Sequence, residues 1–239
     1  RPGKPGPHGE FCLTSHRVPA RQEHPSSVPV SLGHRECCSM ATLLHGPLTE
    51  RSVHLCIDMQ RLFAPEGPWP TPWMERVLPT VARIAERFPE RTVFTRFITP
   101  RRPEDMPGTW RAYYERWRET TREHLDPRFL ELMPPLASLA PPATVIDKPV
   151  YSAFAGHKLA DHLKERQADA LVVTGSETDV CVLATVLGAV DHGYRVVIVA
   201  DGLCSSSDEG HDSLLSLYSK RFSQQIETVD SETVLSAWT

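Results

Sequence analysis

The chain has 239 residues, of which 40% are hydrophobic and 23% are charged, and its formal net charge is −4. This length fits one large domain, or one domain with an appended segment, and the composition is typical of a protein with a hydrophobic core. The slightly acidic balance argues against a nucleic-acid partner. No apolar run approaches the roughly 20 residues that cross a bilayer, so we expect no membrane association.

The cysteines form neither a metal-binding nor a disulfide pattern. The six are Cys12, Cys37, Cys38, Cys56, Cys181 and Cys204. Their spacing contains no Cys-x-x-Cys pair of the zinc-site type, and a chain of this length does not need disulfides for stability. The N-terminal residues lack the apolar segment of a signal peptide. We therefore expect reduced thiols and a cytoplasmic protein.

Residues 1–45 differ from the rest of the chain. They are rich in Pro, Gly, Ser, His and Arg and show no periodic apolar face. We expect a disordered leader or a non-native extension over 1–45 and a folded domain over 46–239. A metal site made from His8, His16, His24 and Cys37-Cys38 is the less favoured alternative, because these residues are irregularly spaced.

From Val53 onwards, short β-branched runs alternate with helical patterns. Strands are predicted over 53–57, 92–97, 144–147, 170–174, 195–200 and 225–228. Helices are predicted over 72–88, with a kink at Pro79, and over 110–124, 156–166, 178–192, 207–222 and 231–238. This alternation predicts an α/β fold with a doubly wound, mainly parallel six-stranded sheet and helices on both faces, which is a Rossmann-like architecture.

Three chemically different side chains follow the ends of predicted strands. They are the carboxylate of Asp58, the ammonium of Lys148 and the thiol of Cys181. The carboxyl ends of parallel strands meet at one edge of a sheet, so these groups should lie close together. A thiol needs a base to become a nucleophile and a cation to hold its thiolate. Together the three residues predict a cysteine hydrolase.

Each of these residues also has a structural interpretation when it is taken alone. Cys181 fits a buried core cysteine, Asp58 fits a loop cap, and Lys148 fits a surface lysine at a strand end. For the thiol, we expect Thr178 to cap the following helix by accepting from the N–H of Cys181. The positive end of the helix dipole should then lower the pKa of Cys181.

The residues around these three positions resemble the isochorismatase-like cysteine hydrolase superfamily, which includes nicotinamidases, N-carbamoylsarcosine amidases and ureidoacrylate amidohydrolases. The resemblance runs from about residue 53 to the C-terminus. The matching elements are Asp58-Met59-Gln60 with Phe63, Thr95-Arg96, Lys148-Pro149 with Ser152 and Phe154, Gly175, Thr178-Asp179, Cys181-Val182, Ala184-Thr185, Gly193-Tyr194 and Asp201.

This resemblance implies a catalytic triad of Asp58, Lys148 and Cys181. Asp58 would accept the thiol proton, Lys148 would stabilise both charges, and Cys181 would attack a carbonyl carbon. The backbone N–H groups of Glu177 and Cys181 would bind the oxyanion. The resemblance also implies a cis peptide bond between Ser176 and Glu177.

The implied activity is cleavage of a C–N bond, other than a peptide bond, in a small amide or carbamoyl compound through a thioester. An isochorismatase-type vinyl-ether hydrolase and a catalytically silent binding module are the alternatives. Nicotinamidases carry an aspartate–histidine metal cluster after the second strand, whereas this chain has no histidine in Thr95–Pro100. We therefore expect no metal and no other cofactor. Glu177 also replaces a residue that is small in many amidases.

Candidate substrate-pocket residues are Gln60, Phe63, Trp110 and Tyr114. The last two belong to an aromatic set with Tyr113 and Trp117 at helical spacing, which either packs on the sheet or closes over the substrate. An arginine within residues 97–132 could pair with a substrate carboxylate. The expected partners are a small-molecule substrate and further copies of the chain in a dimer or tetramer.

Overall fold

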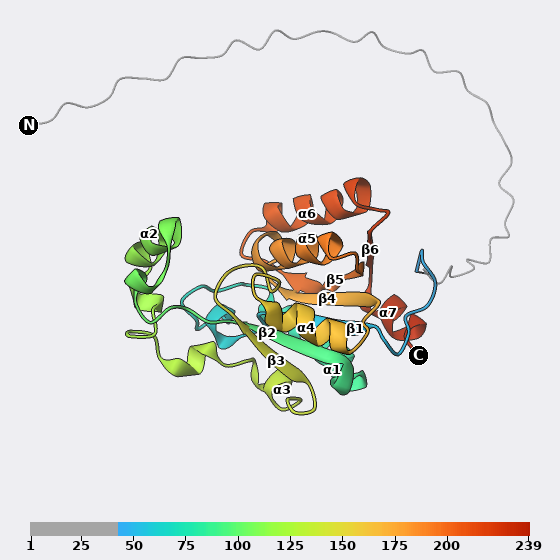
Figure 1. The fold of residues 1–239 in the computed structure, drawn as a ribbon, viewed down its shortest axis with the longest axis horizontal. Coiled ribbons are helices and arrows are strands. Elements are labelled where there is room, and N and C mark those ends of the chain that lie inside the picture. The colour runs from blue at the N-terminus through green and yellow to red at the C-terminus, as the bar shows by residue number, and fades with distance from the viewer. Residues whose placement is uncertain (1–42) are drawn as a thin grey trace, which may run out of the picture. The chain divides into compact units, whose positions relative to one another are not determined.

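A single parallel sheet organises the computed structural model, which describes residues 43–239 (Figure 1). The strand order is β3-β2-β1-β4-β5-β6, and every neighbouring pair is parallel. The strands are β1 (Val53–Ile57), β2 (Thr92–Phe97), β3 (Thr144–Lys148), β4 (Ala170–Ser176), β5 (Arg195–Cys204) and β6 (Ile226–Val229). The predicted doubly wound α/β fold with six parallel strands is confirmed.

Helices cover the sheet on both faces. The α-helices are α1 (Met74–Arg87), α2 (Gly108–Arg116), α3 (Pro134–Ala137), α4 (His157–Glu165), α5 (Leu183–Asp191), α6 (Asp208–Arg221) and α7 (Ser231–Ala237). Alternate strand residues face opposite layers, as the pleat requires. Leu55 and Ile57 pack in the layer with α4, α5 and α6, whereas Cys56 packs in the layer that contains α1. No helix in residues 43–239 is long and apolar enough to cross a membrane.

The predicted helix over 110–124 is shorter than expected and begins earlier. Helix α2 ends at Arg116, and a single 3-10 turn over Arg118–Thr120 follows it. The hydroxyls of Thr120 and Thr121 donate to the carbonyls of the third residue before each, at 2.7 Å. Such local side-chain bonds compete with helix continuation, which the charged pattern alone did not indicate.

The first described residues pack against the C-terminal half of the chain. Leu43 is buried with Trp238, and the Leu44 amide donates to the Glu227 carboxylate. The Trp238 indole N–H donates to the Thr49 carbonyl oxygen at 2.9 Å. The rest of the predicted leader, including the histidines and cysteines considered as a metal site, lies outside the described residues.

Candidate active site

Asp58 is fixed at the point where β1 ends. Its side chain is fully buried, and its backbone takes a positive φ of 48°. The hydroxyl of Thr95, on the neighbouring strand β2, accepts from the Asp58 amide at 3.1 Å and donates to Oδ1 at 2.6 Å. Thr95 of β2 therefore fixes Oδ1 of the carboxylate, which also fixes the direction in which Oδ2 points.

Lys148 reaches this carboxylate from the end of β3, across the intervening strand β2. Its Nζ lies 2.6 Å from Asp58 Oδ2, and the lysine side chain is only 3% exposed. Nζ also donates to the Val150 carbonyl at 3.1 Å and lies 5.0 Å from the centre of the Phe97 ring. Burial lowers the pKa of Lys148, but the negative charge of Asp58, together with the neighbouring Cys181, outweighs burial, and the net shift is upward. The ammonium thus stays charged.

Cys181 lies in a π-helical turn over Thr178–Val182 that directly follows β4. The Glu177 carbonyl accepts from the amides of Val180 and Val182, at 3.1 and 3.0 Å. In a regular helix this carbonyl would be the acceptor for the amide of Cys181. The amides on either side of Cys181 therefore both donate to the carbonyl that the Cys181 N–H would otherwise use. Such π turns are frequent at functional sites.

The expected Thr178 cap is wrong. Glu177 occupies the N-cap position, and Thr178 is buried with its hydroxyl donating to the Cys204 carbonyl at 3.2 Å. The same hydroxyl lies 2.8 Å from His211 Nδ1. Thr178 is drawn away from the helix end because β5 and α6 supply these partners, which are distant in sequence.

The expected lowering of the Cys181 pKa is also wrong. The thiol is within hydrogen-bonding reach of both Asp58 and Lys148. Burial and the negative charge of Asp58 raise the pKa of Cys181 well above its ordinary value, although Lys148 opposes this shift. The resting thiol is therefore protonated, and its proton must leave when the sulfur reacts.

The loop before Cys181 has an unusual backbone. The Ser176–Glu177 peptide bond is cis, as the resemblance implied, and Gly175 has a φ of +115°. A Cβ atom on Gly175 would overlap the backbone of Ile57 in the neighbouring strand β1. Only glycine fits here, and its absent side chain brings the end of β4 against the strand that carries Asp58.

Two serines of the loop before α6 hold the Cys181 loop from outside. The Glu177 carboxylate accepts from the Ser206 amide at 2.9 Å and from its hydroxyl through the same oxygen, Oε2. The Ser205 hydroxyl donates to Asp179. Sequence reasoning missed Ser205 and Ser206, because a serine run before a helix gives only a capping signal.

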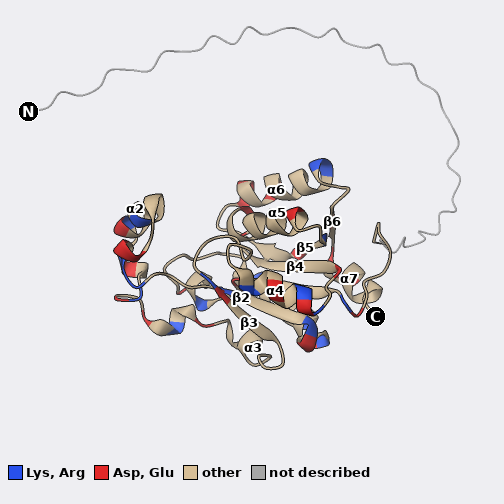
Figure 2. Ribbon diagram, viewed as in Figure 1, with Lys and Arg blue, Asp and Glu red and all other residues tan. Residues whose placement is uncertain are grey.

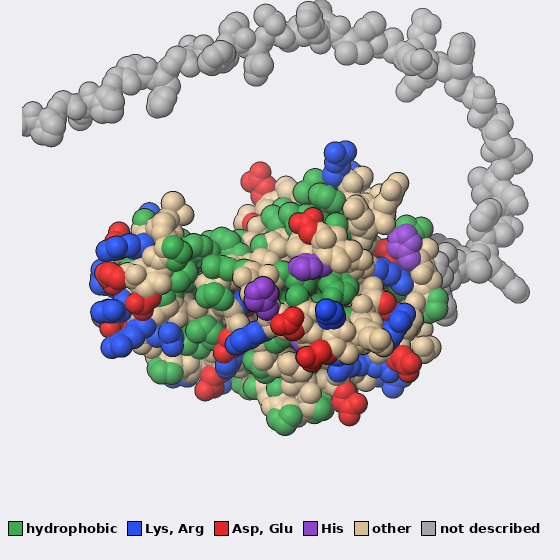
Figure 3. All heavy atoms as spheres, viewed as in Figure 1, with side chains coloured by type: hydrophobic (Ala, Val, Ile, Leu, Met, Phe, Trp, Pro, Cys, Tyr) green, Lys and Arg blue, Asp and Glu red, His purple; other side chains and the backbone are tan. Residues whose placement is uncertain are grey.

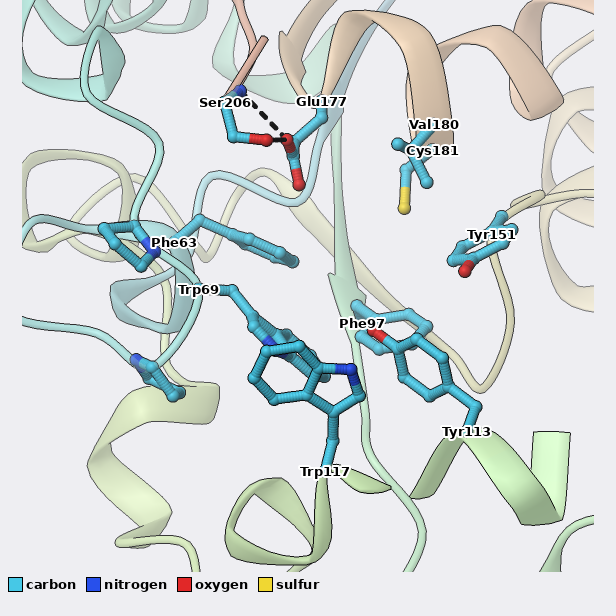
Figure 4. Close-up of a pocket in the computed structure, with 12 residues that line it drawn as sticks. Phe63, Trp69, Phe97, Tyr113, Trp117, Tyr151, Glu177, Val180, Cys181 and Ser206 are labelled. Atoms are coloured by element: carbon cyan, nitrogen blue, oxygen red, sulfur yellow. Dashed lines mark hydrogen bonds between the residues drawn. The ribbon is translucent and has the colours of Figure 1, made fainter. Parts of the chain in front are cut away.

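A cavity of about 350 Å³ opens above Cys181 (Figure 4). The sulfur atom points into it. Asp58 and Lys148 are not among the residues that line it. Its lining is mostly aromatic, and the residues are Phe63, Pro68, Trp69, Pro70, Phe97, Tyr113, Trp117, Tyr151, Glu177, Val180, Cys181 and Ser206.

Three of the four expected pocket residues do not line this cavity. Gln60 is fully buried, and its amide bonds to the backbone of Phe97 and Leu130. Tyr114 is fully buried, and Trp110 stacks on it at 6.1 Å, so both form a layer behind the wall. Phe63 does line the cavity, and its contact with a substrate stays a prediction.

No arginine lines this cavity in the described part of the chain. Arg96, which follows the motif position Thr95, forms a bidentate ion pair with Asp147 at 2.7 and 3.0 Å. No group of three His, Cys, Asp or Glu side chains within residues 43–239 is arranged to hold a metal ion.

The sequence matches a known protein family. The isochorismatase domain model matches residues 52–230. An uncharacterized isochorismatase family protein, PncA of Bacillus subtilis, is 38% identical over 81 residues, which are 34% of this chain and 44% of that protein. The matched segments span less than half the length of each of the curated relatives.

Solved structures extend the likeness to most of the fold. The crystal structure of nicotinamidase PncA from Bacillus subtilis has a TM-score of 0.60 and 26% identity, covering 74% of this chain and 99% of that one. N-carbamoylsarcosine amidase from Thermoplasma acidophilum has a TM-score of 0.61 and 19% identity, covering 76% and 96%. With the domain model matching about three quarters of its length, the chain belongs to the isochorismatase family.

Proposed function

We propose that the protein is a cysteine hydrolase that cleaves a C–N bond of a small amide or carbamoyl compound. One observation carries the proposal: a buried Asp58–Lys148 ion pair touches the protonated thiol of Cys181 at the floor of a cavity. A buried ion pair is a weak source of stability, and its contact with a thiol favours a catalytic purpose.

In the first half-reaction, Asp58 takes the thiol proton while Cys181 Sγ bonds to the substrate carbonyl carbon. The carbonyl oxygen becomes an oxyanion, which accepts from the backbone N–H groups of Glu177 and Cys181. The π turn supports this role, because neighbouring amides occupy the usual acceptor of the Cys181 N–H. The C–N bond then breaks, Asp58 returns the proton to the leaving nitrogen, and a thioester remains.

In the second half-reaction, Asp58 takes a proton from water, and the water oxygen bonds to the thioester carbon. The C–S bond breaks, and Asp58 returns the proton to Cys181 Sγ. Lys148 keeps its charge throughout, since Asp58 and the sulfur raise its pKa. It therefore stabilises whichever of its two neighbours carries the negative charge.

The named relatives support C–N bond chemistry. One similar solved structure is a nicotinamidase, and another is an N-carbamoylsarcosine amidase. A cavity of about 350 Å³ suits a small molecule rather than a peptide chain. An isochorismatase-type vinyl-ether hydrolase would not need the thiol, and a silent binding module would not need a charged pair beside it.

The test is to trap the thioester. The protein is mixed with a panel of small amides, carbamoyl and ureido compounds, quenched in acid within seconds, and analysed by mass spectrometry. We expect an acyl adduct on Cys181 with at least one compound, and none in the Cys181→Ala variant. Turnover of an amide or a vinyl ether by Cys181→Ala at the wild-type rate would contradict the proposal.

A further inference from the structure

The cavity lining points to a substrate class that the proposed function leaves open. We propose that the cavity accepts an amide carrying a cationic group, such as a quaternary ammonium, and places that group among the aromatic rings. The inference rests on the proposed function, because it concerns the occupant of the same cavity.

The aromatic walls form a box in which Phe63 stacks on Trp69 at 28° and the other neighbours of Trp69 are more steeply inclined to it. The ring centroids of Phe97, Tyr113 and Trp117 lie 6.1–6.2 Å from that of Trp69, which is the wall that these three rings share. The planes of these rings are inclined to that of Trp69 by 53°, 52° and 82° respectively. Rings at such angles surround a space from several sides, which is the arrangement that binds quaternary ammonium ions through cation–π attraction.

One carboxylate completes the box. Glu177 is the only residue with a formally charged side chain among those that line the cavity in the part of the chain described. Ser206 holds Oε2, and Figure 4 shows the other oxygen pointing toward the open space. Because this carboxylate is already held in place, little conformational entropy is lost when a cation approaches it.

The catalytic groups do not cancel this negative charge. Asp58 and Lys148 neutralise each other at 2.6 Å, and the thiol of Cys181 is uncharged because burial raises its pKa. An anionic substrate would meet the Glu177 carboxylate, with no lining arginine or lysine to compensate. The formal charge of the lining therefore favours a cation over an anion.

The arginines of the α2 segment do not reverse this preference. Arg111 and Arg116 are exposed, Arg111 pairs with Glu115 at 3.3 Å, and the Arg116 guanidinium lies 5.8 Å from the centre of the Trp117 ring. Figure 2 shows that basic and acidic residues alternate along this helix. In Figure 3 the charged side chains gather at its outer end, and hydrophobic side chains cover the surface between α2 and α5.

A neutral occupant is the alternative, since aromatic walls also bind apolar groups. Two amides of nearly equal shape separate the possibilities. One is (2-acetamidoethyl)trimethylammonium, and the other is N-(3,3-dimethylbutyl)acetamide, in which carbon replaces the charged nitrogen. Binding of each is measured by isothermal titration calorimetry to the Cys181→Ala protein, so that hydrolysis does not interfere. A second measurement is the protection of Cys181 against alkylation in the wild-type protein.

We expect the cation to bind about tenfold more tightly than its neutral isostere. Glu177→Gln retains an oxygen for Ser206 and should abolish most of this preference. Trp117→Leu should weaken binding of the cationic amide more than binding of the neutral one. Trp117→Phe keeps an aromatic face and should retain most of the affinity for the cation.

Equal or tighter binding of the neutral amide, or no binding of the cation at millimolar concentration, would overturn the inference. This outcome does not depend on catalysis. Failure to form a thioester with any amide would count against the proposed function alone, because the ratio of the two affinities would still be measured.

Discussion

Replacing Lys148 by Met removes one charge of a buried pair and keeps a side chain of similar volume. Lys148 is 3% exposed and Asp58 is not exposed, so water cannot take over the lost contact. Breaking a buried pair by removing one partner costs about 3–5 kcal/mol. For a protein of this size, 1 kcal/mol corresponds to about 2–4 °C, so we expect Tm to fall by about 6–20 °C.

The matched control is the double variant Asp58→Asn, Lys148→Met, which has no unpaired charge. Neutral replacement of a buried pair is often tolerated, so the double variant should be more stable than Lys148→Met alone. Its hydrolytic activity should nevertheless be absent, because no base is left beside Cys181. Urea titrations followed by tryptophan fluorescence at pH 7 give the free energy of unfolding of all three proteins.

Two results would refute this reasoning. One is a loss of less than about 1 kcal/mol in Lys148→Met, which is the size expected of an exposed pair. The other is a double variant no more stable than the single one, which would show that the loss comes from packing rather than from the unpaired charge.

Four further predictions concern single groups. Cys181→Ala should lower amide turnover by a factor on the order of 10⁴ or more with an unchanged circular dichroism spectrum, and turnover within tenfold of wild type would remove Cys181 from the mechanism. Alkylation of Cys181 by iodoacetamide should quicken steadily from pH 7 to 9.5, because burial raises the pKa of the thiol, whereas a rate already constant at pH 7 would contradict this. Burial lowers the pKa of His54 from 6.5 to about 3, so the unfolded chain binds a proton that the folded chain does not. Urea unfolding should therefore show stability falling by up to about 1.4 kcal/mol per pH unit as the pH drops below 6.5, with a shallower slope in His54→Gln; equal slopes would count against this origin. Dialysis against EDTA should leave activity unchanged, since no three potential ligands cluster in the described residues, and a loss that zinc restores would argue for a metal.

The juxtaposition of Asp58, Lys148 and Cys181 could be predicted because strand ends are local features. Asp58 follows a short apolar run and Lys148 ends another, and parallel strands bring such ends to one edge whatever the intervening sequence. The ion pair at 2.6 Å follows from that topology. Six strands alternating with helices allowed few arrangements of the chain, so the parallel sheet was also predictable.

The cavity wall was less predictable, because it depends on contacts between residues far apart in sequence. Gln60 was expected to meet the substrate, but the backbones of Phe97 and Leu130 satisfy its amide. Tyr151 lines the cavity from a loop with no periodic signal. The direction of the Cys181 pKa shift was likewise missed. The effect of burial on this pKa outweighs that of the helix terminus, and burial depends on the tertiary structure.

The strand order has a consequence for how the protein folds. Asp58, Lys148 and Cys181 come from β1, β3 and the turn after β4, and 90 residues separate the first two along the chain. Their meeting requires β3-β2-β1-β4 to have assembled in register, and such long-range parallel pairings form slowly. During refolding, recovery of the reactive centre must therefore lag behind helix formation. A stopped-flow comparison of thiol protection with far-ultraviolet circular dichroism would show that lag directly.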